Sequence, residues 1–110
     1  MKKGGRKVIK VVLFCNGGAS TGILVKNIQE AARIRNVSLE INAFPDSKIG
    51  DVVHNVDVIL FGPQIGFKKN RYQNKYIEKA DVMEVIDPVV YGLMNGEKVL
   101  DQILTLYKED

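Results

Sequence analysis

The 110-residue sequence contains no tryptophan, a single histidine and a single cysteine. One cysteine cannot form an intramolecular disulfide or a multi-cysteine metal site, and one histidine adds little to a zinc site. No apolar run approaches the roughly 20 residues that a membrane-spanning helix needs. Residues 1–7 are basic like the start of a signal peptide, but Lys10 interrupts the apolar run that follows. We therefore expect a cytoplasmic protein that does not insert into the membrane.

The net charge of +3 comes from the first ten residues, which carry five basic side chains and no acidic one. The other 100 residues carry 11 basic and 13 acidic side chains, a balance of −2. Beyond the first ten residues, the chain therefore has no excess of positive charge that would bind a polyanion, so we expect no nucleic-acid partner. We expect residues 1–6 to form a disordered basic tail and residues 7–110 to form one domain.

The hydrophobic pattern predicts four strands, each followed by a helix. The strands are expected over residues 8–14, 37–44, 56–61 and 81–86. The first helix is expected to begin at about residue 23, with Ser20 or Thr21 as its cap, and a short second helix to end at about residue 55. The third helix is expected over residues 66–79, and the last one after Asn95, which would cap it. This alternation predicts a single-domain α/β fold, a four-stranded parallel sheet of order 2-1-3-4 with helices on both faces.

In such a sheet, ligands bind at the carboxyl edge of the strands, beside the point where the strand order reverses. Cys15 follows the first strand and therefore lies at this edge. The segments after the third and fourth strands, Gly62-Pro63-Gln64 and Asp87-Pro88, are expected at the same edge. The sequence thus predicts one site built from three loops.

Cys15 opens a loop rich in small residues, Cys15-Asn16-Gly17-Gly18-Ala19-Ser20-Thr21-Gly22. Its glycines permit positive φ and close backbone approach to a ligand. The backbone N–H groups of such a loop and the positive end of the following helix attract an anion, and the same field favours a thiolate. The pattern predicts a phosphate site with a nucleophile; the plainer alternative is a tight turn with a buried thiol.

The loop fails two well-known phosphate motifs. Its glycine spacing fits a nucleotide-binding P-loop, but Ile23 and Leu24 stand where Lys and Ser/Thr are needed, which argues against an NTPase. In the C-x5-R loop of low-molecular-weight tyrosine phosphatases, Thr21 occupies the arginine position. Without a guanidinium, a phosphorylated thiolate could persist and be passed on. Asp87-Pro88 is similar to the general-acid loop of those phosphatases, so a phosphatase or an arsenate-reductase-like hydrolase remains an alternative.

Three motifs together resemble the IIB component of bacterial sugar phosphotransferase systems, lactose/cellobiose class. They are the segment from Cys15 to Thr21, Leu60-Phe61-Gly62-Pro63-Gln64-Ile65, and the segment from Tyr91 to Leu100. The resemblance covers about residues 7–107, and it implies a fold like that of the low-molecular-weight tyrosine phosphatases.

The resemblance implies a phosphoryl carrier that needs neither metal nor cofactor. Cys15 would take a phosphoryl group from a histidine of the IIA protein. It would then pass the group to a β-linked disaccharide (cellobiose, chitobiose or lactose type) held by the membrane protein IIC. The implied phosphate cradle is Asn16, Gly17, Gly18, Ala19, Ser20 and Thr21. Gln64, Asp87 and Tyr91 are expected to form a rim beside it, because the topology places their loops at the same edge of the sheet.

Two further features have plainer interpretations. His54, the only histidine, is expected on the surface of the second helix. Residues 67–76 interleave basic and aromatic side chains, which predicts a buried aromatic stripe and a solvated charged face. That face could help to meet an acidic partner. A non-enzymatic, flavodoxin-like binding module with an inert thiol is the third functional hypothesis.

Overall fold

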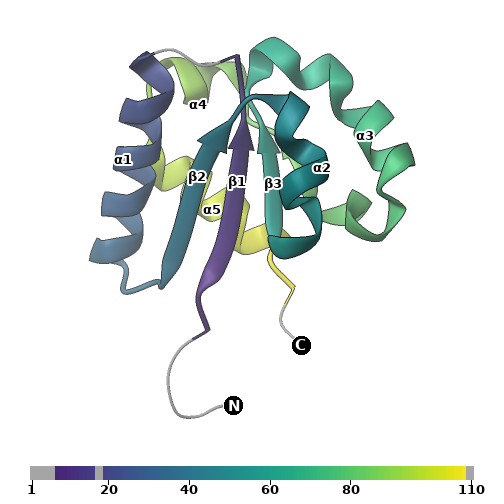
Figure 1. Ribbon diagram of the computed structural model, residues 1–110. Coiled ribbons are helices and arrows are strands. Elements are labelled where there is room, and N and C mark those ends of the chain that lie inside the picture. The colour runs from purple at the N-terminus through teal and green to yellow at the C-terminus, as the bar shows by residue number, and fades with distance from the viewer. Residues whose placement is uncertain (1–6, 17–18, 109–110) are drawn as a thin grey trace.

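Four parallel strands form one sheet in the order β2-β1-β3-β4 (Figure 1). They are β1 (Ile9–Phe14), β2 (Leu39–Phe44), β3 (Val58–Phe61) and β4 (Met83–Val85). The computed structural model describes residues 7–16 and 19–108, so the predicted tail over residues 1–6 lies outside the described residues. The predicted strand order is confirmed.

The register brings the carboxyl ends of all four strands to one edge. Phe14 pairs with both Phe44 and Phe61, and Phe61 pairs with Val85. The ladder continues one residue further, because the backbone N–H of Cys15 donates to the Phe44 carbonyl oxygen at 3.1 Å. The segments that follow the four strands therefore emerge together, as predicted.

The two central strands are buried on both faces because every core position carries an aliphatic or aromatic side chain. Along β1, Val11 and Leu13 join one hydrophobic cluster, whereas Val12 and Phe14 join the other. In β3 all four residues are buried. Burial of each such side chain contributes about 1.5–3 kcal/mol, which explains why these short runs form the centre of the sheet.

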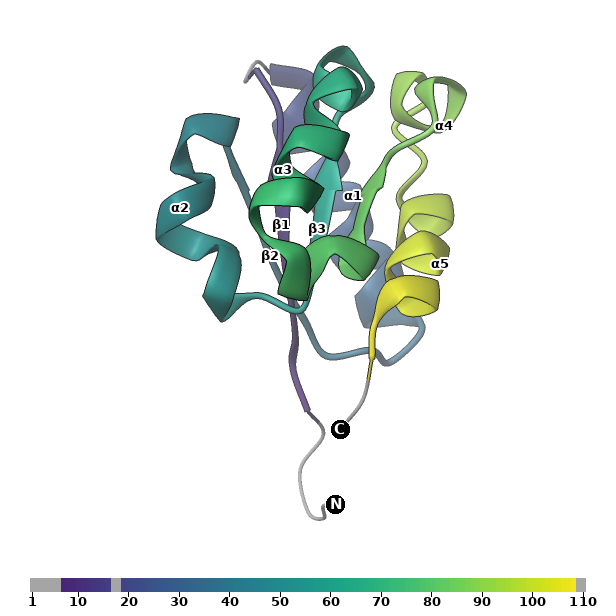
Figure 2. The same ribbon diagram turned by 90° about the vertical axis from the view of Figure 1, so that its right-hand side faces the viewer.

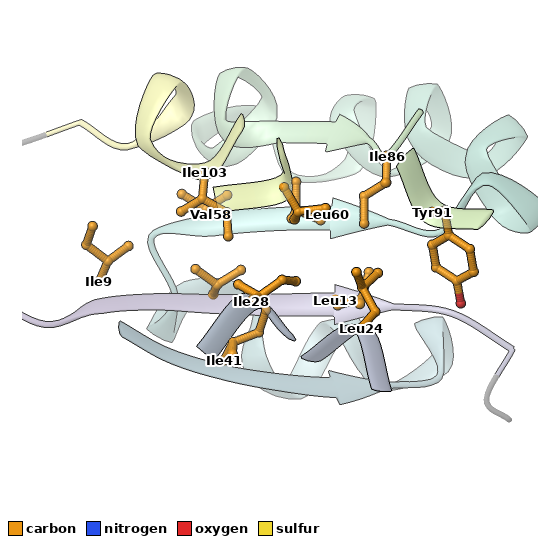
Figure 3. Packing of buried hydrophobic residues seen from close by; sticks show 12 residues of the cluster. Ile9, Leu13, Leu24, Ile28, Ile41, Val58, Leu60, Ile86, Tyr91 and Ile103 are labelled. Atoms are coloured by element: carbon orange, nitrogen blue, oxygen red, sulfur yellow. The ribbon is translucent and has the colours of Figure 1, made fainter. Parts of the chain in front are cut away.

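Helices cover both faces of the sheet (Figures 1 and 2). The helices α1 (Ala19–Ile34) and α5 (Gly96–Leu106) pack on one face, where Leu24, Ile28 and Ile103 meet the sheet (Figure 3). The short helix α2 (Ile49–Val52) and α3 (Lys69–Lys75) pack on the other face. No helix in the described part of the chain is long and apolar enough to cross a membrane.

The third predicted helix, over residues 66–79, is broken into three pieces. A 3-10 segment η3 (Pro63–Lys68) precedes α3, and a second one, η4 (Ile77–Val82), follows it. Tyr76 ends α3 with φ −121° and ψ 69°. Because η4 takes Asp81 and Val82 and the strand ends at Val85, β4 is three residues long instead of the six predicted. Two more 3-10 turns, η1 (Asp46–Lys48) and η2 (Val53–Asn55), flank α2.

The start of α1 differs from the prediction. The helix begins at Ala19, so Ser20 and Thr21 lie in its first turn and do not occupy the N-cap position. Gly22 also lies inside α1 and has no positive φ, so the structure does not use the positive φ that a glycine permits at this position. The helix therefore begins about one turn earlier than predicted, and the free N–H groups at its amino end lie closer to Cys15 in the sequence.

A further helix, α4 (Pro88–Gly92), was not predicted. Five residues are too few for a periodic hydrophobic pattern. The start of α5 agrees with the prediction, because the Asn95 side chain accepts a hydrogen bond from Lys98 N at 3.1 Å.

The aromatic stretch is buried only in part. Tyr72 is buried and its ring stacks on Phe61, with centroids 5.8 Å apart. Phe67 is 80% exposed, so the predicted buried stripe was wrong at this residue. The helical path is broken inside η3 at Ile65, where φ is −120° and ψ is 18°, and Phe67 lies just after this break. His54 is exposed, as predicted, and its Nδ1 lies 3.3 Å from Glu78 Oε2.

Candidate active site around Cys15

Cys15 is the first residue after β1, between the carboxyl ends of β2 and β3. Its side chain is buried, with 3% of the residue exposed. Gly62, the first residue after β3, passes beside it: a Cβ built on Gly62 would lie 3.5 Å from Cys15 Cβ. The glycine is also tied to β1, because its N–H donates to the Phe14 carbonyl oxygen at 2.8 Å. Two strand ends therefore fix the position of the thiol.

The amino end of α1 lies four residues beyond Cys15. Its first N–H groups have no partners inside the helix, and its dipole adds partial positive charge there. The first turn, Ala19 to Gly22, contains no acidic residue that would neutralise this charge. Of the six predicted cradle residues, Gly17 and Gly18 lie outside the described residues, Asn16 is exposed, Ala19 is the first residue of α1 and Ser20 is half-buried.

Thr21, the sixth cradle residue, is buried and bonded to another site residue. Its Oγ1 lies 2.9 Å from the hydroxyl oxygen of Tyr91, which comes from α4. The two residues are 3% and 8% exposed. Figure 3 shows the Tyr91 ring beside Leu24 of α1, beyond the end of β1. The structure therefore brings Tyr91 to the first turn of α1, where the sequence had indicated only a rim position.

Gln64 lies next to Gly62, and so close to Cys15. A Cβ built on Gly62 would lie 2.8 Å from Gln64 Oε1, so the carboxamide of Gln64 folds back over this glycine. The Gly62 backbone is extended, with φ −61° and ψ 150°. The carboxamide is exposed and carries two N–H donors, which gives the site a polar group beside the thiol.

Asp87, the third predicted rim residue, caps α4. Its Oδ1 accepts hydrogen bonds from Val89 N at 2.8 Å and from Val90 N at 3.3 Å. Pro88 occupies the first helical position, where its missing N–H costs nothing. The carboxylate therefore has a structural task, the start of the helix that carries Tyr91.

A carboxylate on the other side of the site links two loops. Asp46 Oδ2 accepts hydrogen bonds from the Tyr72 hydroxyl at 2.6 Å and from Lys68 Nζ at 3.0 Å. The Tyr72 bond, followed by the Lys68 bond and charge, lowers the pKa of the Asp46 carboxyl. Burial, with the nearby carboxylate, raises the pKa of Tyr72. Lys68 belongs to η3, which begins beside Gly62, and Tyr72 to α3, so these bonds hold both elements against the segment after β2.

The same edge is bordered by exposed apolar side chains that the sequence analysis missed. Among the described residues, eight large hydrophobic side chains are exposed, and five of them lie at the carboxyl end of a strand or within nine residues after it. We call these five the apolar rim: Ile23, Phe44, Phe67, Val89 and Leu93. They come from four different elements, α1, β2, η3 and α4 with its carboxyl cap, and the sequence analysis did not identify them as exposed. Exposed apolar side chains gathered at one end of a protein mark a binding surface.

The chain matches, over residues 10–102, the family described as the lactose/cellobiose specific IIB subunit of the phosphotransferase system (PTS). It is 34% identical over 97 residues to the PTS oligo-β-mannoside-specific EIIB component of Bacillus subtilis (strain 168), covering 88% of this chain and 94% of that protein. It is 35% identical over 95 residues to the PTS cellobiose-specific EIIB component of Lactococcus lactis subsp. lactis (strain IL1403), covering 82% and 88%.

Solved structures agree with these matches. The solution structure of the cellobiose-specific phosphotransferase IIB component from Borrelia burgdorferi has a TM-score of 0.78 at 34% identity, covering 94% of each chain. The lactose-specific IIB domain of Streptococcus pneumoniae has a TM-score of 0.79 at 21% identity, covering 93% of this chain and 100% of that one, which shows a shared fold. The chain therefore belongs to the lactose/cellobiose-specific IIB family of the sugar phosphotransferase systems.

Proposed function

We propose that Cys15 carries a phosphoryl group from a phosphohistidine of a IIA protein to a β-linked disaccharide bound by a membrane IIC protein. One observation carries this proposal: a buried cysteine lies at the carboxyl edge of the sheet, four residues before a long helix whose first turn has no acidic residue. A phosphoryl group on sulfur would meet free backbone N–H groups there. The cellobiose- and oligo-β-mannoside-specific relatives support a β-linked sugar as the acceptor.

The chemistry consists of two displacements at phosphorus. In the first, the Cys15 thiolate forms the S–P bond while the P–N bond of phosphohistidine breaks. The electron pair of that bond returns to the imidazole, which leaves neutral if its other nitrogen carries a proton. In the second, a sugar hydroxyl forms the O–P bond, the S–P pair returns to sulfur, and a base of the acceptor protein takes the hydroxyl proton. Backbone donors at Asn16–Ser20 and the Thr21 hydroxyl stabilise the equatorial oxygens in both steps.

A carrier must also avoid losing its phosphoryl group to water. Thr21 stands where a cysteine phosphatase has arginine, so the site has one neutral donor in place of a guanidinium. Asp87, the residue that resembles a general acid, accepts two backbone hydrogen bonds as a helix cap. Both features favour the carrier over the phosphatase or arsenate-reductase-like alternative.

The partners must approach Cys15 from the carboxyl edge of the sheet, where the apolar rim lies. Phe67, Leu93 and Val89 are 80%, 72% and 68% exposed. Contact between such side chains and a partner would remove water from the site and supply affinity. Both partners would use this edge in turn, the IIA protein first and the IIC protein second. The cytoplasmic location remains a prediction, and it is consistent with a IIA protein as donor and a membrane IIC protein as acceptor.

The test is transfer from a phosphorylated IIA protein of a lactose/cellobiose-type system, followed by intact-mass measurement. We expect the wild-type protein to gain one phosphoryl group and the Cys15→Ser variant to gain none. Cysteine and serine have similar volumes, so this variant should remain folded by circular dichroism. Labelling of another residue, or no labelling by a competent donor, would reject the proposal. Rapid turnover of p-nitrophenyl phosphate would favour the phosphatase.

A further inference from the structure

Thr21 and Tyr91 are 70 residues apart in the sequence, and their hydroxyl oxygens lie 2.9 Å apart in the structure. Thr21 belongs to the first turn of α1, six residues after Cys15, and Tyr91 reaches it from α4. Both residues are buried. A hydrogen bond between two buried hydroxyls from separate elements fixes both side chains, because each would otherwise leave a buried polar group without a partner.

The two hydroxyls have two hydrogens, and the bond between them uses one. A phenol is a stronger acid than an aliphatic alcohol and hence the better donor, which favours Tyr91 donating to Thr21 Oγ1. The Thr21 hydrogen then points away from Tyr91 and can donate to another acceptor. In the proposed carrier, the acceptor in that part of the loop is an oxygen of the phosphoryl group on Cys15.

We propose that Tyr91 is a positioning residue for phosphoryl transfer: it orients the Thr21 hydroxyl so that its hydrogen faces the phosphoryl oxygens. This inference rests on the proposed function. Neither hydroxyl loses its proton, and the bonds made and broken at phosphorus stay as described above.

Orientation matters here because of what Thr21 replaces. A guanidinium would present several fixed donors, whereas a threonine hydroxyl has one hydrogen that rotates about the C–O bond. A donor contributes most to catalysis when it is already aimed at the oxygen on which charge develops. The Tyr91 bond restricts that rotation, and α4, which Asp87 and Pro88 start, holds the tyrosine in place.

The experiment measures the rate of Cys15 phosphorylation over a range of phospho-IIA concentrations. Removing a direct donor from such a site lowers the rate by roughly 100-fold, which we expect for Thr21→Val. Tyr91→Phe leaves the donor present but free to rotate, so we expect a loss of roughly tenfold in the maximal rate. The KM for phospho-IIA should stay the same, since partner contacts are unchanged. Thr21→Ser keeps the hydroxyl and should retain most of the rate.

Two controls separate positioning from general damage. Tyr72 is as buried as Tyr91 and its hydroxyl also makes a hydrogen bond, to Asp46. We expect Tyr72→Phe to lose stability and keep its transfer rate. The double variant Thr21→Val/Tyr91→Phe should be no slower than Thr21→Val alone, because Tyr91 acts only through Thr21.

Several results would overturn the inference. They are an unchanged maximal rate in Tyr91→Phe, a change confined to KM, an equal loss in Tyr72→Phe, and a further tenfold loss in the double variant. A wild-type protein that accepts no phosphoryl group would instead refute the proposed function and this inference with it. A wild-type protein that accepts the group while Tyr91→Phe is equally fast would refute the positioning role alone.

Discussion

Among the glycines that the structure describes, Gly96 has the least room for a side chain, and Gly96→Ala tests the packing of α5 against α1. A Cβ built on Gly96 would lie 2.4 Å from the carbonyl carbon and oxygen of Asn27 and 2.7 Å from Ile28 N. These are backbone atoms of α1, so no side chain can rotate away to make room. The alanine must therefore push the start of α5 away from α1.

The magnitude follows from two opposing effects. Alanine is the better helix former by up to about 1 kcal/mol, which favours the variant. Overpacking costs about 1–3 kcal/mol where side chains can adjust, and more where the obstacle is backbone. Separation of the two helices also loosens the contacts of Ile28 and Ile103, two fully buried residues of the same cluster. We expect a net loss of about 2–3 kcal/mol, or roughly 10–15 °C in Tm for a domain of this size.

The assay is urea unfolding at 25 °C, followed by circular dichroism, with thermal unfolding as a second measurement. The matched control is Gly22→Ala in α1, because a Cβ at Gly22 meets nothing within 4 Å. That variant should be as stable as the wild type or more stable by up to about 1 kcal/mol. If Gly96→Ala is as stable as Gly22→Ala, with an unchanged m-value, the close approach of α1 and α5 is wrong.

Three further predictions concern the carboxyl edge of the sheet. Gly62→Ala should lower the free energy of unfolding by less than about 1 kcal/mol, measured by urea unfolding, because the Gly62 φ of −61° suits alanine and the closest obstacle, Gln64 Oε1, can move. A larger loss would mean that an atom other than Gln64 Oε1 blocks the new side chain. The bonds from Tyr72 and Lys68 lower the pKa of Asp46 in the folded protein. They therefore stabilise the folded state fully at pH values above the pKa of the unfolded carboxyl, about 3.9, and this stabilisation is lost as the pH falls through the lower pKa of the folded state. Wild type and Asp46→Asn should therefore differ by about 1–2 kcal/mol at pH 7 and converge near pH 2, and an equal difference at both pH values would contradict this assignment. Asp87→Ala should lose about 1 kcal/mol of stability with the helix cap, whereas Asp87→Asn should lose little, a contrast that thermal unfolding can measure.

The sheet was predictable because each central strand is a short, nearly continuous apolar run. The predicted strands over residues 8–14 and 56–61 contain β1 and β3. Because helical segments separate the predicted strands, the sequence also predicted a parallel sheet and the strand order that the structure has. The position of Cys15 at the carboxyl edge followed from the same pattern. The cap at Asn95 was also predicted, since a local hydrogen bond to a nearby N–H depends on residues close in sequence.

The short and irregular elements were not predictable in the same way. The 3-10 segments η3 and η4 and the five-residue helix α4 are too short for a hydrophobic period, and long-range contacts stabilise them. Lys79 Nζ, for example, donates to the Val56 carbonyl oxygen at 2.7 Å across 23 residues. Phe67 is exposed just after the break in η3 at Ile65, and the residues near it in the sequence do not specify that break.

The sequence by itself determined that this is a parallel α/β domain with one thiol at the start of a glycine-rich loop, because the patterns that predict buried strands and turns involve residues close together in the sequence. Only the tertiary structure decided what surrounds that thiol. The Thr21–Tyr91 bond, the Gln64 carboxamide over Gly62 and the apolar rim join residues far apart in the chain, and their distances depend on how the helices pack against the sheet. These contacts depend on which elements lie next to each other in space, and local patterns in the sequence do not specify that arrangement.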